Sequence, residues 1–335
     1  MISVALCTHD GAAFVDEQVR SILGQTLPPD EIVLGDDAST DDTVAIVERA
    51  VADHRRAGGV VDLIVRRRDP ALGVVANFAD ALAHTHGGLI ALSDQDDIWL
   101  PRKLETISAA FDAEPELLLV HTDARLVDAH GEPTGSTLLQ ALEITSHERH
   151  ELERGDAFDA LLRRNLVTGA TVVLRRELLE SATPFPPGWV HDEWLAVIAA
   201  ATGTVRLVPE ALIDYRQHGG NQIGARRPSA AERMAKLREP REPRATGLVE
   251  RSSALVAALE RREADVPRAH LDGARARLAH DRVRRSLPGF RPARLPRILA
   301  AAARGDYARY SRGGMDMLRD LVQPVSPEPA ATLER

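Results

Sequence analysis

The sequence predicts an α/β domain built on a mostly parallel sheet, followed by a helical extension at the C-terminus. Short apolar runs alternate four times with segments of helical spacing, as in sheets whose parallel strands are joined by helices. The fourth run, 89–92, is followed directly by Asp94, Asp96 and Asp97. The carboxyl ends of parallel strands are where α/β folds bind ligands. We therefore expect a ligand site at this acidic turn.

The first half of the predicted sheet follows from short apolar runs and helix-start signals. In the segment 14–23, Phe14, Val15, Val19, Ile22 and Leu23 fall near helical spacing. Ser or Thr at 39–40 and two acids at 41–42 suit the start of the helix at 43–52. Strands are expected at 2–7, 31–34, 61–65 and 89–92, and helices at 14–23, 43–52 and 77–86.

The second half of the domain has weaker patterning. Gly131, Pro133 and Gly135 mark the stretch 126–154 as a long loop, of the kind that forms lids or acceptor walls. Strands are expected at 117–120 and 205–208, a small-residue turn running into a strand at 166–174, and helices at 157–164 and 191–201. Beyond residue 226, helices are expected at 246–263, 268–285 and near 297–321, with a disordered end.

Composition is that of an ordinary globular protein. The chain has 335 residues, of which 44% are hydrophobic and 27% are charged, which suits one large domain with an appendage or two domains. The only cysteine, Cys7, excludes an internal disulfide and suits a reducing cytosolic setting. There is no run of about 18 to 20 apolar residues and no secretion signal. We therefore expect a cytoplasmic protein.

Charge is distributed unevenly along the chain. Residues 1–224 hold 18 Lys and Arg against 36 Asp and Glu, which gives −18, and residues 225–335 hold 24 against 14, which gives +10 and a total of −8. A basic tail on an acidic body predicts an anionic partner for the tail: phosphate headgroups of a membrane, an acidic acceptor or the body itself. The alternative is a solvated, arginine-rich helical face without a partner. Nothing in the pattern predicts a nucleic-acid partner.

The acids after the fourth strand suit a divalent metal. If the backbone stays extended, Asp94 and Asp96 share one face. Paired carboxylates at a strand end suit Mg²⁺ or Mn²⁺ carrying a diphosphate, whereas the alternative is an acidic turn that caps the next helix. GxGxxG and P-loop fingerprints are absent, so a nucleotide site would depend on acids rather than on glycines.

Seven motifs, taken in order, carry a resemblance. They are CTHDG (7–11), DDASTDDT (36–43), GVVANF (73–78), ALSDQDDIW (91–99), VTGATVV (167–173), HDEWLAVIA (191–199) and YRQHGGNQIG (215–224). With them, residues 1–224 resemble the family-two inverting glycosyltransferases of the GT-A fold. The branch that the chain resembles most is the bacterial rhamnosyltransferase-like one, which builds cell-surface polysaccharides.

The resemblance implies a fold, a reaction and roles for particular residues. It implies a Rossmann-like GT-A domain over 1–224 and transfer of a sugar such as rhamnose from a nucleoside-diphosphate donor to a saccharide or lipid-linked acceptor. The resemblance does not cover residues 225–335, for which charge and helical spacing alone predict a basic helical region. The nucleoside would be held by Thr8, Asp10 and Asp37, with Asp94 near the ribose. Asp96 and His218 would bind Mn²⁺ or Mg²⁺, and Asp192 would be the catalytic base. The residues near the sugar or acceptor would be Thr168, Gly169, Trp99, Glu193 and Trp194.

The chain departs from the family at two places. The family commonly has Tyr-Asn where this chain has His9-Asp10, and often has two tryptophans where this chain has Glu193-Trp194. The change at His9-Asp10 affects contacts to the nucleobase of the donor. The change at Glu193-Trp194 affects the acceptor subsite or adds a second acid beside Asp192. Each implied role also has a structural alternative: a helix-start acid for Asp192, a surface histidine for His218, and core packing for the tryptophans.

The implied reaction is chemically coherent with these residues. Loss of a nucleoside diphosphate places negative charge on the leaving phosphate, which a metal neutralises. A carboxylate on the opposite face removes the acceptor proton, and a single displacement inverts the anomeric carbon. Two alternatives stay open: a sugar-phosphate nucleotidyltransferase, and a non-catalytic scaffold at the membrane. We expect the enzyme in the cytoplasm, with peripheral contact to an anionic membrane through residues 225–335.

Overall fold

The computed structural model describes residues 1–219 and 230–325. The chain divides into two compact units, each described separately below. The N-terminal unit contains Met1–Leu161, Leu166–Phe185 and the chain from Trp189 through the last strand. The helical unit contains the short segments Leu162–Asn165 and Pro186–Gly188 and the helices from residue 230 onward. The predicted boundary at 224/225 lies outside the described residues.

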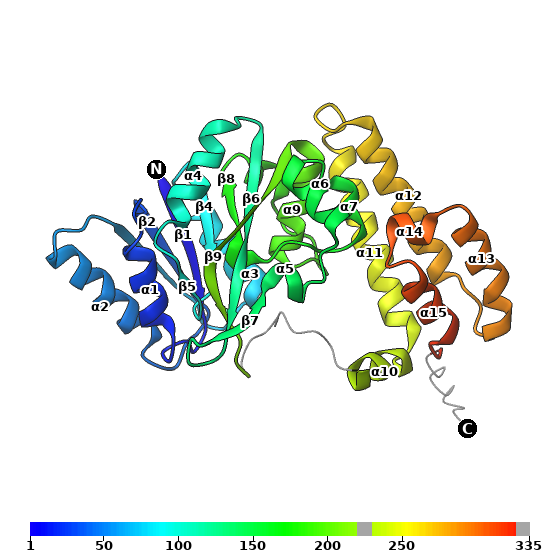
Figure 1. The fold of residues 1–335 in the computed structure, drawn as a ribbon, viewed down its shortest axis with the longest axis horizontal. Coiled ribbons are helices and arrows are strands. Elements are labelled where there is room, and N and C mark those ends of the chain that lie inside the picture. The colour runs from blue at the N-terminus through cyan, green and yellow to red at the C-terminus, as the bar shows by residue number, and fades with distance from the viewer. Residues whose placement is uncertain (220–229, 326–335) are drawn as a thin grey trace, which may run out of the picture. The chain divides into compact units, whose positions relative to one another are not determined.

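Among the residues that the structure describes, all the strands lie in the N-terminal unit (Figure 1). They are β1 (Ile2–Thr8), β2 (Glu31–Asp36), β3 (Asp62–Arg67), β4 (Leu89–Ser93), β5 (Ile98–Trp99), β6 (Leu117–Val127), β7 (Pro133–Thr137), β8 (Val173–Arg175) and β9 (Thr204–Arg216). The helices between them are α1 (Val15–Leu23), α2 (Thr43–Arg56), α3 (Val74–Ala83), α4 (Lys103–Ala113), α5 (Leu138–Ala141), α6 (Ser146–Arg154), α7 (Phe158–Arg163), η1 (Gly169–Thr171), α8 (Leu178–Ala182) and α9 (His191–Thr202).

The strands form one sheet in the order β3-β2-β1-β4-β8-β6-β9-β5, with β7 paired to β6. The long ladders, β1 with β2 and β4, β2 with β3, and β6 with β9, are parallel. The short pairings of β8, β5 and β7 are antiparallel. This confirms the predicted α/β class with a mostly parallel sheet.

Burial explains why these segments form strands and helices. Every residue of β1 and β2 is buried, as in parallel strands covered on both faces. In α1, the buried residues Val15, Val19 and Ile22 recur at helical spacing and join the main core cluster. Because β1 pairs in parallel with both β2 and β4, the carboxyl ends of these three strands lie at one edge of the sheet.

The prediction of a long loop over 126–154 was wrong. This stretch contains the end of β6, β7, α5 and α6. Both helices begin with a capping box, in which Thr137 pairs with Gln140 and Thr145 with Glu148. A threonine followed three residues later by Gln or Glu is a helix-start signal in the sequence. The loop was predicted instead because Gly131, Pro133 and Gly135 lie just before it.

Other predicted elements differ from the structure at their ends. β6 and β9 extend far beyond the predicted 117–120 and 205–208 because they pair with each other along most of their length. Helix α3 begins at Val74 rather than at 77, after Gly73 with a positive φ of 83°. The segment near 297–321 contains three helices, which are separated by Gly305 and Gly313 with φ of 81° and 57°.

The helical unit follows β9. Its helices are α10 (Ala230–Arg238), α11 (Arg241–Glu260), α12 (Arg268–Arg285), η2 (Arg291–Arg294), α13 (Leu295–Ala303), α14 (Asp306–Tyr310) and α15 (Gly314–Val322). Helices α11 and α12 pack on each other, and a small apolar cluster joins α13, α14 and α15. Among the described helices, none is both long and apolar enough to cross a bilayer.

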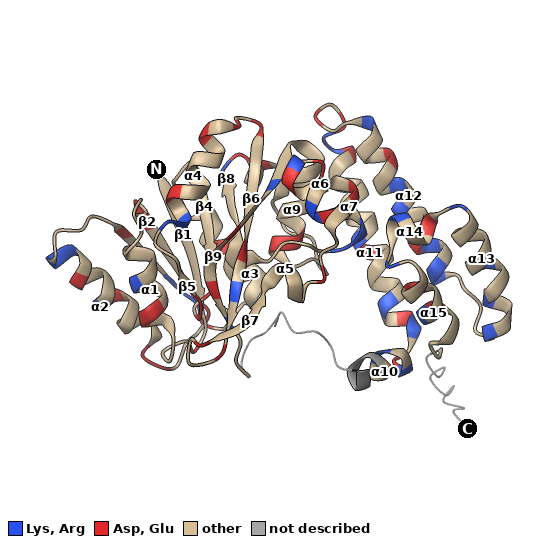
Figure 2. Ribbon diagram, in the orientation of Figure 1, with Lys and Arg blue, Asp and Glu red and all other residues tan. Residues whose placement is uncertain are grey.

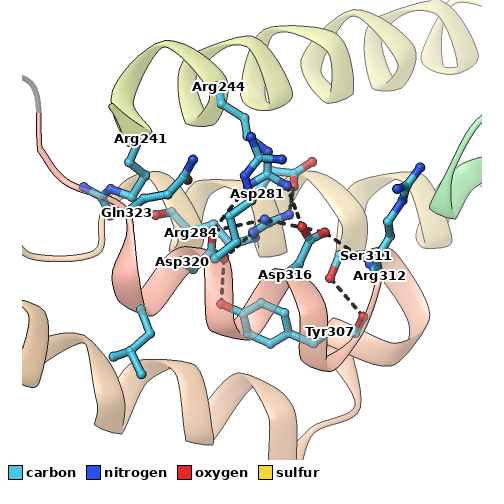
Figure 3. Close-up of polar contacts among 12 residues, drawn as sticks. Arg241, Arg244, Asp281, Arg284, Tyr307, Ser311, Arg312, Asp316, Asp320 and Gln323 are labelled. Atoms are coloured by element: carbon cyan, nitrogen blue, oxygen red, sulfur yellow. Dashed lines mark hydrogen bonds and ion pairs between the residues drawn. The ribbon is translucent and has the colours of Figure 1, made fainter. Parts of the chain in front are cut away.

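Part of the positive charge of this unit is buried in an ionic network (Figure 3). Arg284 donates to both carboxylate oxygens of Asp320, at 2.6 and 3.1 Å. Tyr307 donates to the same carboxylate at 2.9 Å, and Arg244 donates to Asp316 at 2.7 Å. Arg284 is 2% exposed, and an unpaired charge in such a position would be strongly destabilising, so Arg284 is part of the core rather than of a solvated face.

Candidate active site

The acidic turn lies between β4 and β5, at the carboxyl edge of the sheet. Asp94 is partly buried, whereas Asp96 and Asp97 are 9% and 1% exposed. One oxygen of Asp97 accepts the backbone N–H of Arg216 at 3.0 Å, and the Arg216 side chain donates to the backbone oxygen of Asp96 at 2.8 Å. Asp97 therefore attaches the turn to the end of β9.

Asp96 and His218 are in direct contact. The Nε2 atom of His218 lies 2.7 Å from Oδ2 of Asp96, and the imidazole stacks on Phe14 with ring centroids 4.7 Å apart. The pairing of β5 with β9, which aligns Trp99 with Ile213, brings the end of β9 to the acidic turn. Two residues predicted as metal ligands are thus adjacent in space.

Negative charge is concentrated around this turn. Burial, together with Asp96 and Asp192, raises the pKa of Asp94 to about 7. Burial and the neighbouring Asp96 and Asp94 raise the pKa of Asp97 well above its usual value. Tyr215 also has a raised pKa, through burial and the surrounding carboxylates. Since close carboxylates disfavour their own ionised forms, a cation at this position would relieve the repulsion.

Lys103 is the buried basic side chain nearest to this cluster in sequence. Its Nζ donates to the backbone oxygen of Ala170 at 2.9 Å and lies 3.6 Å from the centroid of the Trp99 ring. Burial lowers the pKa of Lys103 well below its usual value, although Asp97 and Asp94 oppose this effect. Lys103 connects α4 to η1, and the sequence prediction missed it even though it follows the acidic motif by only a few residues.

The donor atoms of Asp96 and His218 fit a divalent metal. Within residues 1–219 and 230–325, no three His, Cys, Asp or Glu side chains are grouped so as to hold a metal on their own. Mg²⁺ and Mn²⁺ at nucleotide sites usually take one or two protein ligands, with substrate phosphates and water completing the shell. A carboxylate oxygen and an imidazole nitrogen are suitable ligands for such a site. Gly220 and the rest of its motif to Gly224 lie outside the described residues.

Asp192 is held at the start of α9 by two backbone donors. Its Oδ2 accepts the N–H of Gly169 at 2.8 Å, and its Oδ1 accepts the N–H of Glu193 at 2.6 Å. The residue is 8% exposed, and burial raises the pKa of its carboxyl group to about 6. A carboxylate with a fixed orientation and a pKa near neutrality has the properties of a general base.

Gly169 and His191 shape the surroundings of Asp192. A Cβ atom on Gly169 would lie 3.1 Å from Nε2 of His191 and 3.5 Å from Asp192, so the position suits glycine. The His191 ring stacks on Phe78 of α3 with centroids 4.0 Å apart, and burial lowers its pKa to about 3. His191 is therefore neutral at ordinary pH. The sequence prediction did not assign it a role, although it begins the HDEW motif.

The predicted nucleoside residues gather where β1 and β2 end, because these strands align Thr8 with Asp36. The Thr8 hydroxyl donates to Asp36 at 2.8 Å. Asp37 accepts the backbone N–H groups of Leu72 and Gly73, at 2.6 and 2.8 Å. Asp10 has a φ of 46° and accepts the N–H of Thr40 at 2.7 Å, which lowers the pKa of its carboxyl group.

The residues predicted near the sugar or acceptor differ in burial. Gly169 is buried, and Thr168 and Glu193 are partly exposed. Trp99 and Trp194 are each 2% exposed, and the Trp194 indole donates to the backbone oxygen of Ala182 at 2.7 Å. Core packing accounts for both tryptophans, which favours the structural alternative for them.

A family model described as Glycosyl transferase family 2 matches residues 3–180, more than half of the chain. The chain belongs to glycosyltransferase family 2. This family-2 chain is 28% identical over 220 residues to an uncharacterized protein of Mycobacterium tuberculosis, and the match covers 65% of the chain but only 59% of that relative. It is 25% identical over 240 residues to an uncharacterized glycosyltransferase of Nostoc sp., and this match covers 70% of each.

Solved structures show the same fold. TarS of S. aureus, in a crystal structure with UDP-GlcNAc, superposes with a TM-score of 0.56 at 16% identity, over 92% of this chain and 89% of that one. The mannosyltransferase PcManGT of Pyrobaculum calidifontis, in complex with GDP-Man and Mn²⁺, gives a TM-score of 0.54 at 20% identity, over 90% and 75%. At these identities the likeness establishes the GT-A fold of the family-2 chain.

Proposed function

We propose that this family-2 glycosyltransferase moves a sugar from a nucleoside-diphosphate donor to an acceptor hydroxyl, with inversion at the anomeric carbon. The observation that carries the proposal is the state of Asp192. Its carboxylate is nearly buried, its two oxygens are held by separate backbone donors, and its pKa is raised to about 6. Asp192 also interacts electrostatically with Asp94 of the acidic turn.

The proton transfer follows from this arrangement. As the acceptor oxygen attacks the anomeric carbon, its proton passes to the Asp192 carboxylate. The bond between the anomeric carbon and the diphosphate oxygen breaks in the same displacement, and its electron pair leaves with the nucleoside diphosphate. Attack and departure on opposite faces invert the carbon. The N–H group of Gly169 keeps the accepting carboxylate in place during this step.

We place the donor along the carboxyl edge of the sheet. Thr8, Asp10 and Asp37 would contact the nucleoside, and Asp94 would lie near the ribose; the adjacency of β1, β2 and β4 supports this placement. Asp96 and His218 would hold Mn²⁺ or Mg²⁺, which, when bound, would neutralise charge on the leaving diphosphate. The 2.7 Å separation between Nε2 of His218 and Oδ2 of Asp96 supports that assignment, because both atoms could bind one ion.

The acceptor would approach from the side of Thr168, Gly169 and Glu193, which surround the proposed base. The resemblance in the sequence supports a deoxyhexose such as rhamnose as the donor sugar, a saccharide or lipid-linked acceptor, and a role in cell-envelope polysaccharide synthesis. It also supports a cytoplasmic enzyme that works at the inner face of the plasma membrane.

A donor panel tests the proposal. Thermal unfolding is measured with a series of nucleoside-diphosphate sugars, with and without Mn²⁺ or Mg²⁺. A cognate donor at a hundred times its Kd should stabilise the protein by roughly 2.7 kcal/mol. Turnover should release a nucleoside diphosphate. Release of pyrophosphate from a nucleoside triphosphate and a sugar phosphate would instead identify a nucleotidyltransferase, and failure to turn over any stabilising donor would favour a non-catalytic scaffold.

A further inference from the structure

The C-terminal part of the helical unit has an unusual surface between Ser286 and Val325. Its exposed side chains include several large apolar ones, namely Phe290, Leu295, Leu299, Met315, Leu318 and Val325. Its exposed arginines are Arg291, Arg297, Arg304, Arg309 and Arg312. Figure 2 shows that Lys and Arg are carried on α11, α12 and α13 of the same unit.

This surface has few acidic side chains, and none of them is fully exposed. Only three acids occur between 286 and 325. Asp316 and Asp320 are 6% and 2% exposed and belong to the buried ionic network (Figure 3). Asp306 is partly buried and pairs with Arg304 at 2.7 Å. The exposed surface of this stretch therefore consists of arginine, apolar side chains and small residues, with no fully exposed acid.

Apolar and basic side chains meet at one place on this surface. The buried Arg294 donates to the backbone oxygens of Gly289 at 2.9 Å and Gln323 at 2.7 Å, so the loop that carries Phe290 lies beside the end of α15. A groove of about 520 Å³ opens there, lined by Met234 and Leu237 of α10, Leu318 and Val322 of α15, and two arginines, Arg238 and Arg291.

We refer to Met234, Arg238, Phe290, Arg291, Leu318 and Val325 as the apolar–arginine patch. Phe290 is 72% exposed, and Met234 and Leu318 are each 52% exposed. The nearest acid in sequence, Glu239, lies 3.7 Å from Arg319 and is thus neutralised by a neighbour. Exposed apolar side chains in such a cluster indicate an interaction surface rather than a solvated face.

We propose that the apolar–arginine patch binds the surface of an anionic phospholipid membrane. Phe290, Leu318 and Met234 would enter the boundary between headgroups and acyl chains, where apolar area is removed from water. Arg291 and Arg238 would contact lipid phosphates, since basic side chains are attracted to anionic leaflets. A nucleic-acid backbone would satisfy the arginines but would leave the apolar side chains in water. The biological use of this contact, access to a lipid-linked acceptor, rests on the proposed function, whereas the contact itself does not.

Vesicle flotation with the full-length protein tests the proposal. Wild-type protein should float with vesicles that contain phosphatidylglycerol, less as salt rises, and little with pure phosphatidylcholine. The double variant Phe290→Ser/Leu318→Ser should lower the partition coefficient at least about tenfold, because two apolar side chains no longer insert. Arg291→Ala should lower it about fivefold at low salt and less at high salt.

Matched variants control for folding and for charge alone. Val60 is 86% exposed on the N-terminal unit, and the Arg268 side chain is 94% exposed on α12. Val60→Ser and Arg268→Ala should leave partitioning within about twofold of wild type. Thermal unfolding should give equal midpoints for all four variants, since none of the substituted side chains is buried.

Several results would overturn the proposal. Wild-type protein that stays with the soluble fraction at low salt would reject membrane binding. Equal flotation of wild type and the double variant, or an equal loss in Arg268→Ala and Arg291→Ala, would reject this patch. If sedimentation without vesicles shows a dimer that the double variant cannot form, the patch is a self-association surface. Thermal stabilisation by nucleoside-diphosphate sugars is measured in parallel. If no donor stabilises the protein, the proposed transferase function is refuted, but the flotation results still decide whether the patch binds membranes.

Discussion

Asp96 and His218 are separated by 122 positions in the sequence, and their side chains meet at 2.7 Å. The contact depends on the short pairing of β5 with β9 and on the stacking of the imidazole on Phe14. Both side chains are mostly buried, with 12% and 15% of their surface exposed. The pairing of β5 with β9 thus brings together the two turns that carry the pair, and these are the two ligands proposed above for the metal.

The first prediction concerns metal-dependent donor binding. Asp96→Ala should abolish the additional thermal stabilisation that Mn²⁺ gives to a bound nucleoside-diphosphate sugar, because the only carboxylate in the pair is lost. His218→Ala should reduce it less, since water can replace one ligand. Asp97→Asn is the matched comparison: its side-chain oxygen can still accept the backbone N–H of Arg216, so the fold and the metal response should both persist. A full metal response in Asp96→Ala would refute the assignment.

The second prediction concerns the base. Asp192→Asn keeps the size of the side chain but cannot accept a proton, so transfer should fall about a hundred- to ten-thousand-fold. Donor binding and the unfolding midpoint should change little. Glu193→Gln, at the adjacent acid, should keep most of the activity. If the Glu193 variant lost transfer while the Asp192 variant kept it, the base would be Glu193 and the assignment to Asp192 would be wrong.

The third prediction is the pH dependence of transfer. The pKa of Asp192 is raised to about 6, so the proton-accepting form predominates above that pH. The rate of transfer should therefore fall as pH drops through about 6, by roughly tenfold per unit below it. The measurement is kcat across pH 4.5 to 8 (roughly) with saturating donor. A rate that stays flat through this range would exclude Asp192 as the titrating base.

The fourth prediction is the pH dependence of stability at Asp94. Its pKa rises from 3.8 to about 7 on folding, so the folded state binds more protons between these values. The contribution of Asp94 to stability is therefore present at low pH and lost as pH rises through about 7. Asp94→Asn should unfold at a higher temperature than wild type at about pH 8, and the gap should shrink at about pH 5. A variant less stable than wild type at both pH values would contradict this.

The fifth prediction concerns Gly169. Gly169→Ala would place a Cβ 3.1 Å from Nε2 of His191, which requires the imidazole beside the base to shift, and would bring the Cβ into contact with Asp192 at 3.5 Å. Overpacking of this kind typically costs about 1–3 kcal/mol. Transfer should fall more than donor binding does. Gly247→Ala, inside α11 with open space around it, is the control and should stabilise the protein by about 0.5–1 kcal/mol. Unchanged transfer in Gly169→Ala would show that the close packing of Gly169 against His191 and Asp192 does not control the position of the base.

Local interactions made part of this protein readable from its sequence. The apolar runs of β1 and β4 and the periodicity of α1 and α12 depend on residues a few positions apart, and these elements lie where the sequence predicts them. The motifs around Asp96 and Asp192 likewise carried the fold family. Even the missed helices α5 and α6 had readable signals in Thr137–Gln140 and Thr145–Glu148.

Only the tertiary structure decided how distant segments meet. The contact of Asp96 with His218, the bond from Gly169 to Asp192 and the burial of Trp99 and Trp194 depend on strand pairing and helix packing between parts of the chain that are far apart in sequence. The same packing buries the carboxyl groups of Asp94 and Asp192, and this burial raises their pKa values. Hydrophobic periodicity specifies which face of an element is buried, but the partner of that face is set by the packing of the whole sheet.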